Sequence, residues 1–360
     1  MHLRNKEREA MDISEILTFT KEQGASDLHI SSGEPPIIRI HGDIQKVDMP
    51  SLSQEEVHTM LYDILNDQQL KAFESDKEID FAIDLKGIAR YRINAFYQSK
   101  GEAIVFRTIP TKIMSLEELN LPMILSDLTA KTKGLILVTG PTGSGKSTTL
   151  AAMIDYINQN KRLHILTIED PIEFVYEPKL SLINQRELGT NTHSFANALR
   201  SALREDPDVI LVGEMRDLET ISLAMTAAET GHLVLGTLHT SSAAKTIDRV
   251  IDVFPHEQQN QVRAMFSESL LAVVTQNLLK KKDGKGRVAA LEIMIGTPAV
   301  RNLIREGKVA QLFGMMQTGK QFGMQTMDST LADLCKQGVL SKETVMPYLT
   351  NPSALSSYGA

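Results

Sequence analysis

Two different patterns of apolar and polar residues divide the chain. Over the first third, short runs alternate between apolar and polar residues, which is typical of half-buried β-strands. Two longer segments, 12–23 and 52–73, instead place apolar residues at helical spacing. This pattern predicts a small α+β domain over residues 11–109, preceded by a mostly charged, disordered extension at residues 1–10. The strands expected in this domain are residues 26–31, 36–41, 79–84, 87–96 and 103–109.

The pattern changes beyond residues 110–122, a segment with a proline at each end that we expect to be the inter-domain linker. After it, apolar runs rich in β-branched residues alternate with helical segments, as in a parallel sheet covered by helices. The sequence therefore predicts an α/β domain over residues 123–296 and a helical C-terminal region over residues 297–360. The strands expected in the second domain are residues 135–139, 164–168, 209–212 and 233–237.

The strongest motif follows the first of these strands. Residues 134–150 read GLILVTGPTGSGKSTTL, which fits the P-loop pattern G-x-x-x-x-G-K-[ST] between a strand and a helix. Glycines let the backbone curl so that its N–H groups cradle phosphates, and the helix N-terminus adds a partial positive charge. Lys146 would supply a charge to the terminal phosphates, and the Ser147 hydroxyl would ligate Mg²⁺. The residues predicted to bind ATP here are Gly140, Pro141, Thr142, Gly143, Ser144, Gly145, Lys146, Ser147 and Thr148.

Carboxylates follow two of the other predicted strands. HILTIEDPIEF ends a strand in Glu169, and LREDPDVILVGEMRD places Glu214 just after another. Strand ends are where α/β folds hold their sites, so we expect Glu169 to hold Mg²⁺ or its water shell. In P-loop proteins a second strand of the sheet usually ends in an Asp that helps to hold Mg²⁺. Here Gly213 takes the place of that Asp, and we expect the next residue, Glu214, to orient or deprotonate the attacking water. The alternatives are an acidic turn that caps a helix at Glu169 and a plain surface carboxylate at Glu214.

Two further groups of residues are candidates for sensing the terminal phosphate. His232 and His239 flank a predicted strand in TGHLVLGTLHT, although a histidine is more often a hydrogen-bonded structural residue. Arg90, Arg92 and Arg107 lie on apolar strands of the first domain. An arginine on such a strand must be paired or reach a phosphate, and a solvated sheet face is the alternative.

Composition excludes several other classes of protein. The 360 residues carry a net charge of −7, so no global field attracts nucleic acid or anionic lipid. No run approaches 18 apolar residues, the first residues lack a signal-peptide pattern, and Cys335 is the only cysteine, which excludes multi-cysteine zinc sites. The basic cluster at residues 280–287 has no aromatic residues between its charges and predicts an exposed turn rather than a nucleic-acid site.

The four motif segments together resemble the Walker A, Asp-box, Walker B and His-box signatures of the type II/IV secretion ATPases. The resemblance is continuous over residues 203–255 and covers about residues 11–345. Two further segments resemble one branch of this family, the twitching-motility retraction ATPases of type IV pili: GASDLHIS and GTPAVRNLIREGKVAQ. Within the second, AVRNLIRE at residues 299–306 would be the retraction-specific segment. The resemblance implies a PAS-like first domain, a RecA-like second domain, and a ring of six chains with ATP between the domains.

The resemblance also implies roles, partners and a location. Glu214 would be the catalytic carboxylate, and Glu169 and Lys146 would take part in catalysis with it. The two histidines and three arginines named above would contact the nucleotide. The expected activity is ATP hydrolysis that drives pilin depolymerisation through an inner-membrane platform protein, at the cytoplasmic face of that membrane. A second retraction ATPase is a further expected partner, whereas neither nucleic-acid binding nor membrane insertion is expected. The alternatives are an assembly or secretion ATPase and an accessory retraction subunit.

Overall fold

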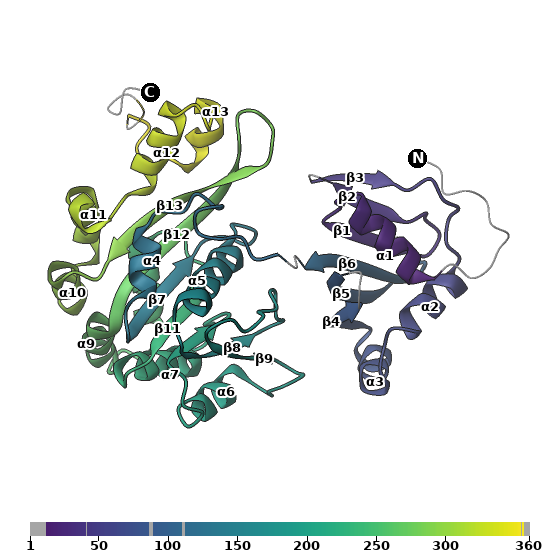
Figure 1. Cartoon of the computed structure of the whole chain (residues 1–360), viewed down its shortest axis with the longest axis horizontal. Helices are drawn as coiled ribbons and strands as arrows, with labels where there is room; N and C mark the ends of the chain where they lie inside the picture. The colour runs from purple at the N-terminus through teal and green to yellow at the C-terminus, as the bar shows by residue number, and fades with distance from the viewer. Residues whose placement is uncertain (1–11, 41, 86–88, 110–111, 354, 356–360) are drawn as a thin grey trace. The chain divides into compact units, whose positions relative to one another are not determined.

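The computed structural model divides the chain into two compact units, Met1–Lys112 and Ile113–Ala360, which are described separately (Figure 1). The extension predicted at residues 1–10 lies outside the described residues. Within the described parts of the chain, every helix falls short of the length and apolarity needed to cross a membrane. The residues that the structure describes are 12–40, 42–85, 89–109, 112–353 and 355.

The first unit is an antiparallel sheet with helices packed on one face. Its strands are β1 (Asp27–Ser31), β2 (Ile37–Ile40), β3 (Asp43–Lys46), β4 (Glu78–Leu85), β5 (Ala89–Gln98) and β6 (Gly101–Ile109), and its helices are α1 (Ile13–Glu22), α2 (Gln54–Tyr62) and α3 (Asp67–Asp76). The strand order is β3-β2-β1-β6-β5-β4. The strands and helices expected from the apolar pattern are confirmed, and β3 is an addition. Its residues, DIQK, are all exposed, so they do not show the alternation that marks a half-buried strand.

Alternation along the strands places the core of this unit on one face. On β5, Tyr91, Ile93 and Ala95 are buried and face α1, α2 and α3, whereas the residues between them point to the other face. Helix starts follow from local sequence, because Ser53 and Glu56 form a reciprocal capping box at the start of α2.

The second unit is a mostly parallel sheet between two layers of helices. Its strands are β7 (Gly134–Thr139), β8 (His164–Glu169), β9 (Leu182–Glu187), β10 (Val209–Val212), β11 (Leu233–Leu238), β12 (Leu270–Lys280) and β13 (Arg287–Ile295). They lie in the order β13-β12-β7-β11-β10-β8-β9, in which the β12–β13 pair is antiparallel and the other neighbours are parallel. All four strands predicted for this region are confirmed. The helices are α4 (Ile124–Thr129), α5 (Lys146–Asn160), α6 (Phe195–Ala202), α7 (Leu218–Glu229), α8 (Ala243–Asp252), α9 (Gln259–Ser269), α10 (Pro298–Arg305), α11 (Leu312–Thr318), α12 (Met327–Lys336) and α13 (Lys342–Val345).

Both faces of this sheet are buried, which explains its continuous apolar strands. All six residues of β7 are buried; Leu137 belongs to the core formed with residues of α6, α7, α8 and α9, and its neighbour Ile136 belongs to the core formed with residues of α4 and α5. Leu116 and Leu121 are buried in the core beside α5. Most of the segment expected to be a linker therefore packs as part of the second unit, because its apolar side chains have a core to enter.

The segment that resembles the retraction-specific signature forms α10. Val300 is fully buried, and the half-buried Arg301 donates from Nε to the carbonyl oxygen of Gly296 (2.8 Å) and from Nη2 to that of Leu270 (3.1 Å). These carbonyls lie just after β13 and at the start of β12. Arg301 therefore holds the β12–β13 pair in place, in addition to any role at the surface.

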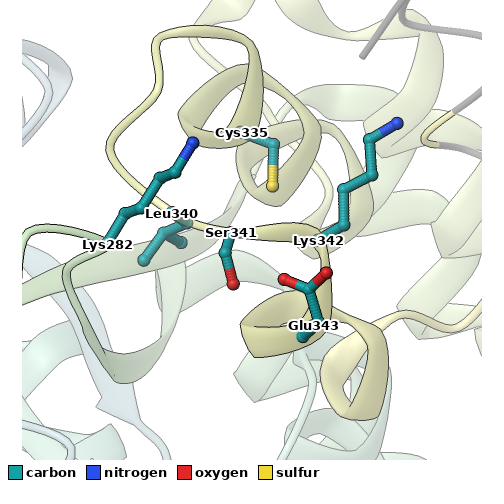
Figure 2. A pocket seen from close by; sticks show the side chains of 6 residues that line it. All are labelled: Lys282, Cys335, Leu340, Ser341, Lys342 and Glu343. Carbon is teal, nitrogen blue, oxygen red and sulfur yellow. The ribbon is translucent and has the colours of Figure 1, made fainter.

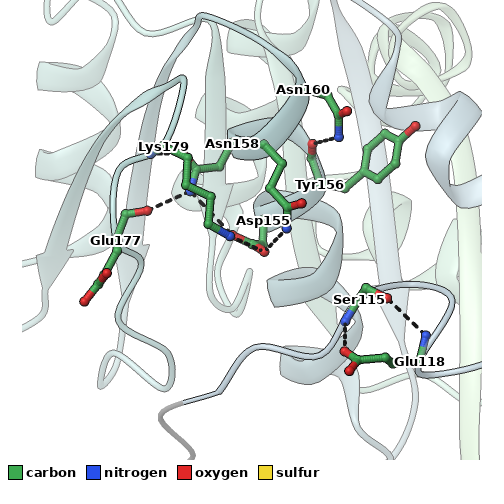
Figure 3. Close-up of polar contacts among 9 residues, drawn as sticks. Ser115, Glu118, Asp155, Tyr156, Asn158, Asn160, Glu177 and Lys179 are labelled. Atoms are coloured by element: carbon green, nitrogen blue, oxygen red, sulfur yellow. Dashed lines mark hydrogen bonds and ion pairs between the residues drawn. The ribbon is translucent and has the colours of Figure 1, made fainter.

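Helix α5 also holds the loop that joins β8 to β9 (Figure 3). Asn158 is fully buried; its Oδ1 accepts from the backbone N–H of Lys179 (2.9 Å), and its Nδ2 donates to the carbonyl of Glu177 (2.9 Å). Asp155 pairs with the Lys179 ammonium at 2.7 Å. Helix α5 therefore fixes the far end of the loop that follows Glu169.

We expect Asn158→Ala to release this loop, because the backbone N–H of Lys179 and the carbonyl of Glu177 would lose their hydrogen bonds to the buried Asn158 side chain. Hydrogen exchange over residues 172–180 should become faster, and the free energy of unfolding should fall by about 1–3 kcal/mol. Asn160→Ala is the matched control: Asn160 is exposed on the same helix and donates to the carbonyl of Tyr156 (2.7 Å), a residue of that helix. Equal exchange in the two variants would contradict the role given to Asn158.

Candidate functional site

Four neighbouring strands of the second sheet end at one edge, and each is followed by a motif singled out in the sequence. β7, β11, β10 and β8 are parallel, with Thr139 opposite Leu238 and Val212 opposite Ile168. Parallel strands bring the segments that follow them to the same edge of the sheet. The P-loop, residues 140–147, follows β7, His239 follows β11, Glu214 follows β10, and Glu169 ends β8.

The P-loop has the shape of a phosphate cradle. Gly140, Gly143 and Gly145 have φ of 140°, 77° and 87°, a region that other residues rarely adopt. A Cβ on Gly140 would also lie 2.2 Å from the carbonyl oxygen of Gln276, so the loop has no room for a side chain there. The Ser144 side chain is buried, and its Oγ has no hydrogen-bond partner among the described residues. These features fit a loop that surrounds an anionic ligand.

Lys146 is held inside this loop. Its Nζ donates to the carbonyl oxygens of Gly140 (2.9 Å) and Pro141 (3.0 Å) and lies 3.5 Å from His239 Nδ1. Burial lowers the pKa of Lys146, while Glu214 and Glu173 oppose that shift. A phosphate would give the ammonium a partner of opposite charge in place of neutral carbonyls. Ser147 and Thr148 follow on the first turn of α5, where both are half-buried.

Glu214 and His239 are in direct contact. Glu214 Oε1 lies 3.2 Å from His239 Nε2, and Oε2 accepts from Arg216 at 2.6 Å. The hydrogen bond from Arg216 is the main reason why the pKa of Glu214 is lowered. A neutral imidazole with its proton on Nε2 satisfies both contacts of His239, since it donates to Glu214 and accepts from Lys146. His239 therefore bridges the P-loop lysine and an ionised carboxylate.

Glu169 is the buried carboxylate of the site. Thr167 Oγ1 donates to it at 2.7 Å, and Gln185 Nε2 donates at 3.3 Å. Burial is the largest effect on this group and raises the pKa of Glu169 to about 7. The backbone of Gly213 passes so close that a Cβ there would lie 3.1 Å from Glu169 Cα. This approach gives a physical reason for the glycine that replaces the expected Asp.

The structure places some predicted site residues elsewhere. His232 precedes β11, so it lies at the opposite edge of the sheet from the P-loop, and its Nδ1 lies 2.9 Å from the carbonyl oxygen of Ala227. Six strand residues separate the two edges, about 20 Å of β-strand. His232 therefore lies away from the P-loop of its own chain, because a strand sends its two flanking residues to opposite edges, and its contact with a nucleotide stays a prediction.

The three arginines lie in the first unit. Arg92 Nε donates to Asp80 at 3.2 Å, and Arg107 Nε donates to Asp27 at 2.9 Å. Arg90 lies on β5, the same strand as Arg92. Carboxylates thus pair Arg92 and Arg107 within their own unit, and contact of the arginines with a nucleotide stays a prediction.

Sequence reasoning missed Gln276, which lies on β12 and contacts the P-loop. Its Nε2 donates to the Ser144 carbonyl at 2.6 Å, and its Oε1 accepts from Thr149 Oγ1 at 2.7 Å. The available signal was a run of polar residues, TQN, inside the otherwise apolar strand LLAVVTQNLLK. A polar residue that is buried in such a strand needs a hydrogen-bond partner.

A separate cavity of about 390 Å³ lies where the β12–β13 turn meets the C-terminal helices (Figure 2). Burial raises the pKa of the Cys335 thiol, which keeps it protonated at neutral pH. No predicted site residue lines this cavity, so we do not assign it to the site. The lining residues are Lys282, Cys335, Leu340, Ser341, Lys342 and Glu343.

The raised pKa of Glu169 predicts a pH dependence of stability in metal- and nucleotide-free protein. The folded state keeps a proton that the unfolded state releases between pH 4.5 and about 7. The stability contributed by neutral Glu169 is therefore fully present below this window and lost as the pH rises through 7. Relative to Glu169→Gln, wild type should lose up to about 3 kcal/mol of unfolding free energy across the window, measured by denaturation in EDTA. Glu229→Gln, an exposed change on α7, is the control, and a wild-type to Glu169→Gln difference that is constant with pH would contradict the assignment.

Comparisons with known proteins agree on one family. The model of the family "Type II/IV secretion system protein" matches residues 5–346. The chain is 61% identical over 333 residues to the "Type IV pilus retractation ATPase PilT" of Pseudomonas aeruginosa, covering 92% of this chain and 96% of that protein. It is 58% identical over 321 residues to the "Twitching motility protein" of Neisseria gonorrhoeae, covering 89% of this chain and 86% of that protein.

A solved structure has the same fold over nearly the whole chain. The "Crystal Structure of the Pilus Retraction Motor PilT and Bound ADP" superposes with a TM-score of 0.90 at 48% identity, covering 96% of this chain and 99% of that one. Sequence, fold and the arrangement of the four motifs lead to the same conclusion. The chain belongs to the type II/IV secretion ATPase family and, within it, to the PilT branch.

Proposed function

We propose that this chain is an ATP-hydrolysing motor that powers type IV pilus retraction and twitching motility. The observation that carries the proposal is the meeting of the P-loop, His239, Glu214 and Glu169 at one sheet edge. The relative at 61% identity is itself a pilus retraction ATPase, and the structure at 48% identity is a retraction motor with bound ADP. ATP is the proposed substrate, with Mg²⁺ as its metal partner.

The P-loop would hold the phosphates through its backbone N–H groups and Lys146. The glycine-lined loop and the unpartnered Ser144 hydroxyl fit this use. Ser147 and Glu169 would hold Mg²⁺ or its water shell, which suits the hydroxyl and carboxylate oxygens that this ion prefers. When bound, the ion neutralises charge on the phosphate oxygens. Lys146 would give up the carbonyls of Gly140 and Pro141 for phosphate oxygens.

Glu214 would position the water that attacks the terminal phosphate. Its lowered pKa keeps it ionised at neutral pH, so it can accept a hydrogen bond from water and hold it in line. His239 contacts both Glu214 and Lys146, and it would link the state of the phosphate to that of the carboxylate. The chain's own part in the reaction is thus to orient water, to bind phosphate and to keep both groups in place.

Force generation rests on features of the family. We propose a homohexamer in which the first unit is PAS-like, the second is RecA-like, and Arg90, Arg92 and Arg107 contact the nucleotide. Loss of the γ-phosphate would open each pair of units in turn and move an inner-membrane platform protein, so that pilin subunits leave the fibre. The ring would work at the cytoplasmic face of the inner membrane, with a second retraction ATPase as a partner, without nucleic acid and without inserting into the bilayer.

The catalytic proposal predicts two different kinetic defects. Lys146→Ala should abolish nucleotide binding, because the loop loses its only ammonium. Glu214→Gln should still bind ATP but hydrolyse it at least about 100-fold more slowly, because water loses its orienting carboxylate. Phosphate release and binding of a fluorescent ATP analogue measure the two properties, with Glu229→Gln as the control. Turnover at the wild-type rate in Glu214→Gln would remove Glu214 from the catalytic role.

A further inference from the structure

One buried side chain on β12 holds the P-loop at two points. Gln276 is 2% exposed, its Nε2 donates to the carbonyl of Ser144 (2.6 Å), and its Oε1 accepts from the Thr149 hydroxyl (2.7 Å). Ser144 lies in the loop, and Thr149 lies on the first turns of α5. The carboxamide therefore ties the loop to the helix that follows it, although Gln276 is more than 120 residues away in sequence.

The backbone around Gln276 fits against the loop equally closely. A Cβ on Gly140 would lie 2.2 Å from the Gln276 carbonyl oxygen, and a Cβ on Gly145 would lie 2.8 Å from Gln276 Nε2. The preceding residue adds a buried contact, in which the hydroxyls of Thr275 and Thr139 lie 2.9 Å apart. The two ends of the loop, at Gly140 and at Ser144–Gly145, are thus packed onto β12, and Gln276 contacts both.

The chemistry of this contact requires an amide. The Ser144 carbonyl can only accept a hydrogen bond, so the group opposite it must be a donor. A glutamate would place an oxygen against that carbonyl, and a leucine would leave both Ser144 and Thr149 without partners in a buried position. Glutamine offers a donor and an acceptor on one planar group, as this position demands.

We propose that Gln276 is a positioning residue for nucleotide binding, which rests on the ATPase function proposed above. A loop carbonyl that turned toward the phosphates would repel them. By anchoring the Ser144 carbonyl, Gln276 keeps it directed at β12, so that the loop's N–H groups stay available to the ligand. Gln276 pre-organises the cradle and does not itself touch phosphate.

The proposal predicts a specific split in kinetic constants for Gln276→Leu. The anchored loop binds phosphate equally in the ground state and the transition state, so its loss should raise KM and leave kcat almost unchanged. We expect the dissociation constant for a fluorescent ADP to rise about tenfold, with kcat at saturating ATP within about threefold of wild type. Gln276→Glu should bind ADP more weakly than Gln276→Leu, because it adds a negative charge beside the loop.

Gln325→Leu is the matched control. Gln325 is a half-buried glutamine whose Nε2 also donates to a backbone carbonyl, that of Leu291 at 2.9 Å, but on the far side of the β12–β13 pair from the P-loop. A merely structural role for Gln276 predicts that both variants lose thermal stability and that neither changes ADP affinity selectively. Our proposal predicts weaker ADP binding in Gln276→Leu alone.

Each result of this experiment decides something different. Wild-type ADP affinity in folded Gln276→Leu, or equal weakening in both variants, would overturn the positioning role. If Gln276→Leu does not fold, Thr149→Val is the second test, because it removes one of the two hydrogen bonds of Gln276 and keeps the shape of the side chain. Weaker ADP binding in Thr149→Val would support the proposal, and unchanged binding would contradict it. Failure of wild type itself to bind ADP would instead overturn the proposed ATPase function.

Discussion

The parallel pairing of β7, β11, β10 and β8 is the constraint on which the site depends. These strands run in one direction, so the segments that leave them share one edge, although they come from distant parts of the chain. The P-loop, His239, Glu214 and Glu169 are brought together by this register, and not by neighbourhood in sequence. Helices on both faces bury the strands and hold the register in place.

Once the motifs share an edge, each contact sets the state of the next group. Arg216 lowers the pKa of Glu214, and His239 bridges Glu214 to Lys146 in the P-loop. Burial raises the pKa of Glu169 to about 7 on the neighbouring strand. The two carboxylates therefore differ in pKa: Glu214 is suited to orienting water, whereas Glu169 lies in a closed, hydrogen-bonded position where a bound cation would favour its ionised form.

Structural features that depend on neighbouring residues in the sequence could be predicted. Contacts between residues that are far apart in the sequence could not. The P-loop is a local motif, and the buried strands are continuous apolar runs, so both were predicted. The position of His232 away from the P-loop of its own chain could not be predicted, because a motif gives no sign of which end of a strand faces the site. Gln276 was missed because its partners, Ser144 and Thr149, lie more than 120 residues away and are joined to it only through strand order. The surroundings of Glu169 likewise include a distant partner, because Gln185 on the neighbouring strand β9 donates to its carboxylate, as does Thr167 on its own strand.

The central claim is that this ATPase drives retraction. The most direct test deletes the gene and complements it with either the wild-type chain or Glu214→Gln, and then counts surface pili while twitching is recorded. A retraction motor predicts abundant pili without twitching in the deletion strain and in the Glu214→Gln strain, with both properties restored by the wild type. Cells without pili would contradict this role, because they would show that this ATPase drives assembly.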